Sequence, residues 1–283
     1  MVVEERDKVI KGSHHLPILL DVFYNKNVTD APLIIFCHGY KGFKDWGAWN
    51  LLAKTFADSG VAVLKFNFSH NGGTVEQPID FPDLEAFGHN NYTKELDDLN
   101  QVLDWVETAY AKHSNIDASN ITLVGHSRGG GIVTLKAAED SRVKNLVSLA
   151  GVSDFKSRFP KGLDLDTWKS TGVRFVMNGR TKQQMPHYYQ FYENFIANTP
   201  RLSIQAAAKN LNLPHLIIHG DADTSVDLKE ALELHQWHPE SQLIVLEGAN
   251  HVFGSHHPWA FMDLPPCLQQ IHSKINHFIN NLS

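Results

Sequence analysis

Cysteine is scarce in this sequence, long apolar runs are missing, and positive charge does not dominate. Two of the 283 residues are cysteine, too few for the disulfide framework of a small secreted domain, and we expect Cys37 and Cys267 to be unpaired thiols. No apolar run approaches a membrane span in length, and the first eight residues, MVVEERDK, carry charge where a signal peptide needs an apolar core. The net charge of −6 gives no attraction to nucleic acid or to an anionic membrane. These absences predict a cytoplasmic protein with no nucleic-acid and no membrane partner.

The sequence does contain enough apolar material for a large core, arranged as alternating strands and helices. The hydrophobic share is 42%, and 283 residues suit one α/β domain with an insertion. After an entry hairpin at 8–24, apolar runs predict strands at 32–37, 61–68, 121–124, 143–149, 213–219 and 242–246, with helices at 46–59, 92–110, 132–139, 228–238 and 267–282. This alternation predicts an α/β fold with a doubly wound, mostly parallel sheet.

The stretch between the strands that end at 149 and begin at 213 is roughly sixty residues long, too long for a single crossover. It is rich in aromatic residues and contains turn signals such as Asn178-Gly179. We interpret residues 155–210 as a cap insertion on a core formed by 1–154 and 211–283. Most of the rings are expected to pack the cap onto the core, and a minority to line a substrate pocket.

A glycine-flanked serine lies between a predicted strand and a predicted helix. Gly125, His126, Ser127, Arg128 and Gly129 match G-x-S-x-G, the pattern of a nucleophile elbow. A serine on so sharp a turn has strained backbone geometry, and the residues two before and two after it must lack a Cβ to let strand and helix pass closely. A dinucleotide-binding turn is excluded because G-x-G-x-x-G would need glycine at position 127.

A serine hydroxyl is a poor nucleophile near neutral pH, so it needs a base within reach and an acid that orients that base. Asp223 follows the strand at 213–219, and His251 follows the strand at 242–246. The order serine, acid, histidine is the one found in α/β-hydrolases. We therefore predict Ser127 as nucleophile, His251 as base and Asp223 as the acid.

Other residues compete for two of these roles: Asp221 for the acid, and His126, His256 and His257 for the base. We prefer Asp223 because Asp221 lies in the first turn after the strand, where aspartate commonly accepts backbone N–H groups. His126 is expected to point away from the nucleophile across the elbow. The other two histidines follow no strand end that would aim them at Ser127.

Three motifs together resemble a known family: HGYKG at 38–42, GHSRG at 125–129 and HGDAD at 219–223. They are similar to signatures of the α/β-hydrolase superfamily, and in particular of dienelactone-hydrolase-like and feruloyl-esterase-like serine carboxylesterases. The resemblance covers nearly the whole chain and implies ester hydrolysis through an acyl-enzyme, without a metal or an organic cofactor. True dienelactone hydrolases carry a cysteine nucleophile, whereas this chain has Ser127.

The resemblance also implies an oxyanion hole built from two backbone N–H groups. In α/β-hydrolases, one donor lies in the loop after a central strand and the other follows the nucleophile. In this sequence those positions are Tyr40 and Arg128.

The predicted function is that of a serine hydrolase acting on a small-molecule ester, and the aromatic segment favours an aromatic or medium-chain acyl group. Two alternatives stay open. The same three residues would cleave amides, as in a peptidase acting on short peptides, and the scaffold could serve as a non-catalytic ligand-binding protein. A homo-oligomer is compatible with the sequence.

Overall fold

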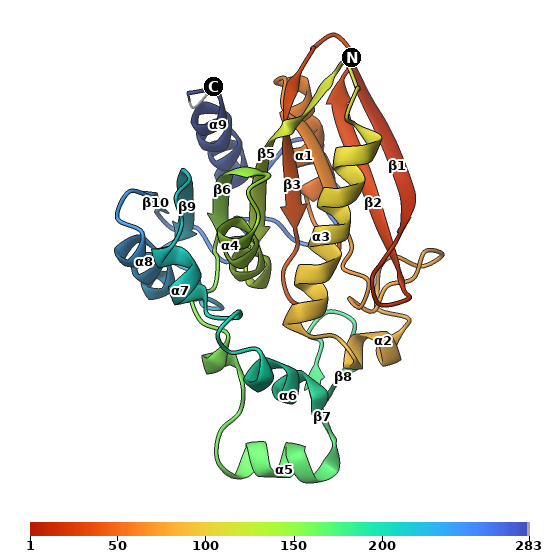
Figure 1. Cartoon of the computed structure of the whole chain (residues 1–283), viewed down its shortest axis with the longest axis vertical. Helices are drawn as coiled ribbons and strands as arrows, with labels where there is room; N and C mark the ends of the chain where they lie inside the picture. The colour runs from red at the N-terminus through yellow and green to blue at the C-terminus, as the bar shows by residue number, and fades with distance from the viewer. Residues whose placement is uncertain (282–283) are drawn as a thin grey trace.

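The computed structural model describes residues 1–281 and is built around one large sheet (Figure 1). Within these residues, eight strands pair in the order β1-β2-β4-β3-β5-β6-β9-β10. β2 runs antiparallel to its neighbours β1 and β4, and the remaining pairs are parallel. The strands are β1 Val2–Lys11, β2 Pro17–Asn25, β3 Ala31–Cys37, β4 Ala62–Phe66, β5 Ile116–His126, β6 Val143–Leu149, β9 His215–Gly220 and β10 Gln242–Leu246. The predicted α/β fold with a mostly parallel sheet is confirmed.

Helices cover both faces of this sheet. α1 (Trp49–Asp58) and α9 (Pro266–Asn280) pack on one face, and α3 (Tyr92–Ala109), α4 (Arg128–Glu139) and α8 (Leu228–Trp237) pack on the other. The last helix was expected to end at residue 282, which lies outside the described residues. In residues 1–281, no helix combines the length and the apolar character needed to cross a membrane.

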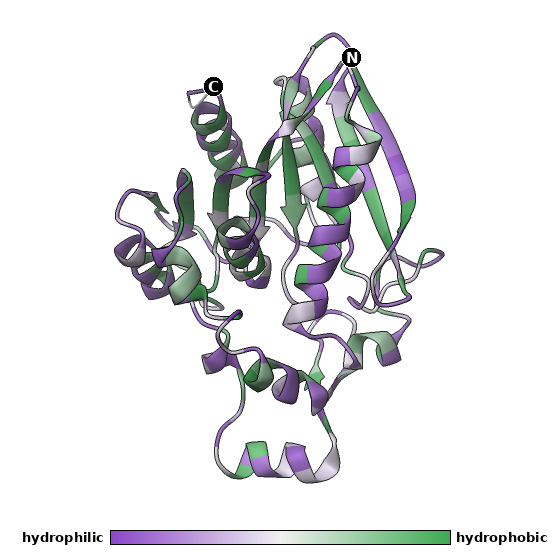
Figure 2. Ribbon diagram, in the orientation of Figure 1, coloured by the Kyte–Doolittle hydropathy of each residue, from purple (hydrophilic) through white to green (hydrophobic). Residues whose placement is uncertain are grey.

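The central strand β3 shows how the sequence fills both sides of the sheet. Successive side chains of a strand point to opposite faces. Leu33 and Ile35 accordingly join the cluster under α3 and α4, while Ile34 and Phe36 join the cluster under α1 and α9. The strand is therefore hydrophobic along its length (Figure 2), as expected of a strand buried on both faces.

The entry hairpin is longer than predicted, because β1 begins at Val2 rather than near Lys8. The charged residues at its start lie on an edge strand and find partners there. Arg6 pairs with Glu4 at 2.8 Å, and Lys54 pairs with the same carboxylate at 3.1 Å. Charge at a sheet edge is compatible with a strand because those side chains remain partly in water.

Helix α1 begins later than the predicted range of 46–59. Gly47 has a φ of +57°, and its N–H donates to Nδ1 of His257 at 3.0 Å. The chain there follows a distant loop instead of a helix, and α1 begins at Trp49. At the other end Gly60 lies just after the helix with a φ of +92°, the left-handed geometry predicted for it.

Between β6 and β9 the chain leaves the sheet and forms a group of small elements: the 3₁₀ turn η1 Lys156–Arg158, α5 Leu163–Thr171, β7 Val173–Met177, β8 Gln184–Tyr188, α6 Gln190–Ala197 and α7 Ile204–Lys209. β7 and β8 form an antiparallel hairpin, whose turn contains the Asn178-Gly179 pair. α7 packs against α4 and α8. The hairpin, α5 and α6 lie beyond the carboxyl ends of the sheet strands (Figure 1), so they cover the edge where the predicted catalytic loops emerge.

The predicted loop at 69–89 contains one short helix, α2 (Leu84–Gly88). Asp83 caps it by accepting the N–H of Ala86 at 2.9 Å. A Cβ at Gly88 would lie 2.7 Å from the ring of Tyr188 in β8. A helix this short is unstable alone, so its packing against the hairpin explains why the sequence does not reveal it.

Candidate active site

Ser127 occupies a sharp turn between β5 and α4, with a φ of 58° and a ψ of −120°. This conformation lies outside the regions that L residues ordinarily adopt. A Cβ at Gly125 would lie 2.3 Å from the carbonyl oxygen of Gly129, and a Cβ at Gly129 would lie 2.4 Å from the carbonyl oxygen of Cys37. Both glycines are therefore required by the close passage of strand and helix.

Replacing Gly129 by alanine is expected to lower the free energy of unfolding by about 3 kcal/mol, because the new methyl group overlaps backbone atoms that cannot move aside. Urea unfolding followed by circular dichroism measures the change. The matched control is Gly179→Ala in the β7–β8 turn, where an added Cβ meets nothing within 4 Å and the change should stay within about 0.5 kcal/mol. Equal losses in both variants would contradict the steric explanation.

The structure brings Ser127, His251 and Asp223 together from three strand ends. Nε2 of His251 lies 3.0 Å from Oγ of Ser127, and Nδ1 lies 2.7 Å from Oδ2 of Asp223. The carboxylate accepts a hydrogen bond from Nδ1–H, which fixes the tautomer and leaves Nε2 free to accept the serine proton. The side chain of Asp223 is fully buried, whereas that of His251 is 20% exposed. The ring can therefore reach both the carboxylate and a ligand above the serine.

The surroundings of Asp223 keep its carboxylate ionised. Oδ1 accepts the N–H groups of Ser225 and Val226 at 2.8 and 2.9 Å, and Oδ2 faces Nε2 of His219 at 3.5 Å. Burial alone would raise the pKa of Asp223, but the hydrogen bonds from His219, His251 and Val226 hold it well below its ordinary value. A permanent negative charge at this position stabilises an imidazolium on His251.

Asp221, the other candidate acid, has a different partner. Its Oδ1 accepts the N–H of Gly248 at 2.6 Å. The sequence suggested that Asp221 accepts backbone N–H groups in its own turn; the donor instead comes from the loop that carries His251. Asp221 thus ties together the two loops that bear Asp223 and His251.

The side chain of His126, expected to point away from Ser127, contacts the loop of His251. Its Nε2–H donates to the carbonyl oxygen of His251 at 2.8 Å, and the two rings lie 4.8 Å apart. The pKa of His126 is lowered to about 3, first by burial and then by the nearby His251, so the ring is neutral. It supports the loop of His251 from behind. Of the other candidates, His257 accepts the N–H of Gly47, and His256 packs on Trp259 with ring centroids 5.0 Å apart.

The loop after β3 runs beside the nucleophile. Nδ1–H of His38 donates to the carbonyl oxygen of Gly39 at 2.9 Å, and burial lowers the pKa of His38 to about 4. A Cβ at Gly39 would lie 2.9 Å from Cβ of Ser127. In the part of the chain that the structure describes, the backbone N–H groups of Tyr40 and Arg128 make no hydrogen bond to a protein acceptor. Both donors are thus available to a ligand oxygen.

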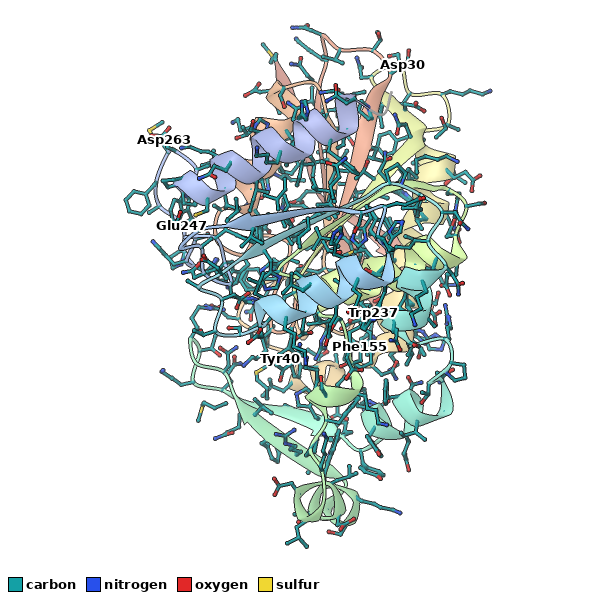
Figure 3. All side chains as sticks on the ribbon, turned by 90° about the vertical axis from the view of Figure 1, so that its left-hand side faces the viewer. Asp30, Tyr40, Phe155, Trp237, Glu247 and Asp263 are labelled. Carbon is teal, nitrogen blue, oxygen red and sulfur yellow. The ribbon has the colours of Figure 1, made fainter. Side chains whose placement is uncertain are left out.

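A cavity of about 470 Å³ opens over Ser127 and His251. Tyr40 and Phe155 mark the place where the core meets the segment between β6 and β9 (Figure 3). Both parts contribute aromatic walls: Tyr40, Tyr92, Phe155, Phe159, Trp168 and Phe191. Most of these rings are also buried in the packing between the two parts. The sequence suggested that most rings pack the cap onto the core and that a minority line the pocket. In the structure, the same rings do both.

Sequence reasoning missed the polar side chains of this cavity, among them Arg174 and His187. These two are cross-strand partners in the β7–β8 hairpin. Nε2 of His187 accepts a hydrogen bond from the hydroxyl of Tyr40 at 2.7 Å. Strand alternation in the hairpin was the signal that could have found them. In residues 1–281, no group of three His, Cys, Asp or Glu side chains could hold a metal ion.

These observations define an α/β protein with a serine, a histidine and a carboxylate in hydrogen-bond reach at the carboxyl edge of its sheet, the arrangement that many hydrolases use. A family model described as "Alpha/beta hydrolase family" matches residues 34–262, more than half of the sequence. The chain belongs to the alpha/beta hydrolase family. Membership supports a hydrolase activity.

The chain is similar to two known proteins, to one over part of its length and to the other at lower identity. An uncharacterized 31.7 kDa protein from the traX-finO intergenic region of Escherichia coli is 34% identical over 127 residues, which cover 44% of this chain and 38% of that protein. The chain thus spans well under half the length of this relative. The 2-hydroxymuconate semialdehyde hydrolase of Pseudomonas sp. (strain CF600) is 26% identical over 259 residues, 81% of this chain and 80% of that protein.

Solved structures resemble the whole chain. Est1E from Butyrivibrio proteoclasticus with bound ferulic acid superposes with a TM-score of 0.69 at 19% identity, covering 97% of this chain and 98% of Est1E. Dienelactone hydrolase from Anabaena variabilis gives a TM-score of 0.64 at 15% identity, covering 99% and 98%. At these identities the similarity shows the fold alone. The predicted resemblance to esterase-like and dienelactone-hydrolase-like α/β-hydrolases is confirmed.

Proposed function

We propose that this protein is a serine hydrolase that cleaves carboxylic esters of small molecules through an acyl-enzyme. The observation that carries the proposal is the continuous hydrogen-bond chain from Asp223 through His251 to Ser127, with distances of 2.7 and 3.0 Å, that ends at a cavity of about 470 Å³. Structural similarity to Est1E, whose structure contains bound ferulic acid, supports a substrate with an aromatic acyl group.

In the first half of the reaction, Oγ of Ser127 forms a bond to the ester carbonyl carbon while its proton passes to Nε2 of His251. The negative charge that develops on the carbonyl oxygen is held by the N–H groups of Tyr40 and Arg128. The bond to the alcohol oxygen then breaks, and His251 returns the proton to the leaving alcohol. The serine is left acylated.

In the second half, a water molecule takes the place of the alcohol. His251 accepts a proton from the water as its oxygen attacks the acyl carbon, and the same two N–H groups hold the second oxyanion. The bond from the acyl carbon to Oγ breaks, and the proton on His251 restores the serine hydroxyl. Asp223 remains ionised throughout and stabilises the imidazolium in both halves.

The walls of the cavity favour an acyl or alcohol group with an aromatic or medium-length apolar part. Phe155, Phe159 and Phe191 are buried side chains that line the cavity, and rings of this kind pack well against a planar or alkyl group. This preference is part of the proposal. It separates the protein from hydrolases that accept small acetyl esters alone.

The test is covalent labelling of the wild-type protein with a fluorophosphonate probe, with the labelled peptide identified by mass spectrometry. We expect one label, on Ser127, because Oγ is the nucleophile that His251 activates. A panel of p-nitrophenyl esters and matching p-nitroanilides, with acetyl, hexanoyl and cinnamoyl groups, then separates the alternatives. Amide turnover equal to ester turnover would favour a peptidase, and a protein that neither labels nor turns over any substrate would be a ligand-binding scaffold.

A further inference from the structure

The cavity over Ser127 is lined by four positively charged side chains: Lys41, Arg128, Arg158 and Arg174. Among the residues described, its lining contains no aspartate or glutamate. The chain as a whole carries a net charge of −6, so composition does not explain a positive cavity. A concentration of one sign of charge in a recess of low dielectric attracts ligands of the opposite sign.

Arg128 is the most enclosed of these cations, with a side chain that is 15% exposed. Its guanidinium lies 4.3 Å from the ring centroid of Tyr40 and 5.4 Å from that of Tyr92. One of its N–H groups donates to Oε1 of Glu95 at 3.2 Å. A guanidinium has five N–H donors, and in residues 1–281 this is the one hydrogen bond that it makes. Arg128 lines the cavity, so donors that have no protein acceptor within these residues are left for a ligand.

The other cations differ in how far they are neutralised. Arg158 pairs with the carboxylate of Glu230. Lys41 donates to an uncharged group, the carbonyl oxygen of Met177, at 3.3 Å. Arg174 has no carboxylate within ion-pair distance in the described part of the chain. Two of the four charges are therefore uncompensated, and the enclosed charge of Arg128 is opposed by a single buried carboxylate.

The pKa of His187 is affected by the same positive charges. His187 belongs to β8, contacts Tyr40 in the loop after β3 and lines the cavity. Its pKa is lowered to about 3, first by burial and then by the charges of Arg128, Arg174 and Lys41. The contribution of these three cations means that a further positive charge is disfavoured at His187.

We propose that the cavity contains an anion subsite, formed by Arg128, Arg174 and Lys41, that selects substrates carrying a carboxylate besides the ester to be cleaved. The inference rests on the proposed function, and it names the substrate class of that site. The planar guanidinium of Arg128 can donate two parallel hydrogen bonds to a carboxylate, and its place next to Ser127 in sequence keeps the subsite within reach of the scissile ester. Arg174 and Lys41 add charge from the hairpin and from the loop after β3.

The first experiment measures binding without catalysis. Ser127→Ala protein is titrated by calorimetry with monomethyl adipate, which carries one carboxylate, and with dimethyl adipate, which is neutral and otherwise matched. We expect the anionic ester to bind on the order of tenfold to a hundredfold more tightly, with the difference shrinking as NaCl is added. Equal binding, or tighter binding of the neutral ester, would overturn the subsite whether or not the protein turns over esters.

Substitutions then assign the difference to particular side chains. Arg174→Gln, at an exposed hairpin position, should reduce the preference for the monoester about threefold to tenfold. Lys112→Gln removes the same charge from an exposed position outside the cavity and should leave the preference unchanged. If both variants change it equally, the effect comes from overall charge and not from a subsite.

Arg128 is tested together with its buried partner, because removing the cation alone would leave the carboxylate of Glu95 uncompensated. The double variant Glu95→Gln/Arg128→Gln should lower the preference to what Arg174 and Lys41 provide without Arg128. Glu95→Gln alone keeps an oxygen acceptor for Arg128 but removes the opposing charge, so it should increase the preference. Opposite responses of these two variants, checked for folding by thermal unfolding, are the specific signature of the subsite; a parallel loss in both would contradict it.

Wild-type kinetics with p-nitrophenyl hydrogen adipate and p-nitrophenyl methyl adipate complete the test. The ratio of the two kcat/KM values should favour the anionic ester by the same factor as binding does. Turnover of the neutral ester, together with labelling of Ser127, reports on the proposed function by itself. Neutral turnover with a ratio at or below one would therefore reject the subsite and leave the esterase proposal standing.

Discussion

Replacing Ser127 by alanine is expected to lower kcat for p-nitrophenyl hexanoate on the order of 10⁵- to 10⁶-fold. The hydroxyl is the group that bonds to the acyl carbon. In the proposed mechanism, it is the one nucleophile that His251, at 3.0 Å from it, activates in the first step. Removing the serine nucleophile of such a triad lowers kcat about as much as removing all three residues, because the serine, the histidine and the carboxylate act as a unit. Stopped-flow and steady-state release of p-nitrophenol measure the effect.

The control for this variant is Ser273→Ala, which removes an exposed hydroxyl from α9. It should retain wild-type kcat and KM. Ser127→Ala should keep the wild-type fold, since alanine can occupy the same small volume in the turn. Retention of more than about one-tenth of the wild-type rate by a folded Ser127→Ala protein would exclude the acyl-enzyme mechanism.

Replacing Asp223 by asparagine is expected to lower kcat about 10⁴-fold. The carboxylate accepts a hydrogen bond from Nδ1–H of His251 at 2.7 Å. An amide at the same place can donate to Nδ1 instead, which moves the ring proton to Nε2 and removes the base that Ser127 needs. It also removes the negative charge that stabilises the imidazolium. KM should change little, because Asp223 is buried beneath the site.

The chain offers a matched control two residues earlier. Asp221→Asn keeps an oxygen that can accept the N–H of Gly248, so it should alter kcat less than about tenfold. The pair of variants also decides between the two acids that the sequence left in competition. A larger loss in Asp221→Asn than in Asp223→Asn would reverse the assignment.

The fold could be predicted because its signals are local. Residues 32–37 are a continuous apolar run, and the chain indeed forms β3 at Ala31–Cys37. The glycines around Ser127 are visible in the sequence as a five-residue pattern, although the atoms that a Cβ at Gly129 would meet belong to the end of the distant strand β3. Loops at the ends of parallel strands meet at one edge, so the closeness of Asp223 and His251 to Ser127 followed from chain order. Their catalytic roles, and those of the N–H groups of Tyr40 and Arg128, stay proposals.

The features that the sequence did not predict depend on contacts between distant segments of the chain. The direction of His126 is set by the carbonyl oxygen of His251, 125 residues away. The start of α1 is set by His257, and the pairing of Arg128 with Glu95 joins two helices. Neither composition nor periodicity reports such pairs. The border of the cap at 155 and 210 likewise stays a prediction.

One consequence follows from the origin of the cavity walls. The side chains proposed to make and break bonds all come from loops of the central sheet, whereas Phe159, Trp168, Arg174 and His187 come from the stretch inserted between β6 and β9. Substitutions within that stretch can thus change which molecules bind in the cavity, while Ser127, His251 and Asp223 keep their distances from one another. A library randomised at those four positions alone is the economical route to new selectivity in this scaffold.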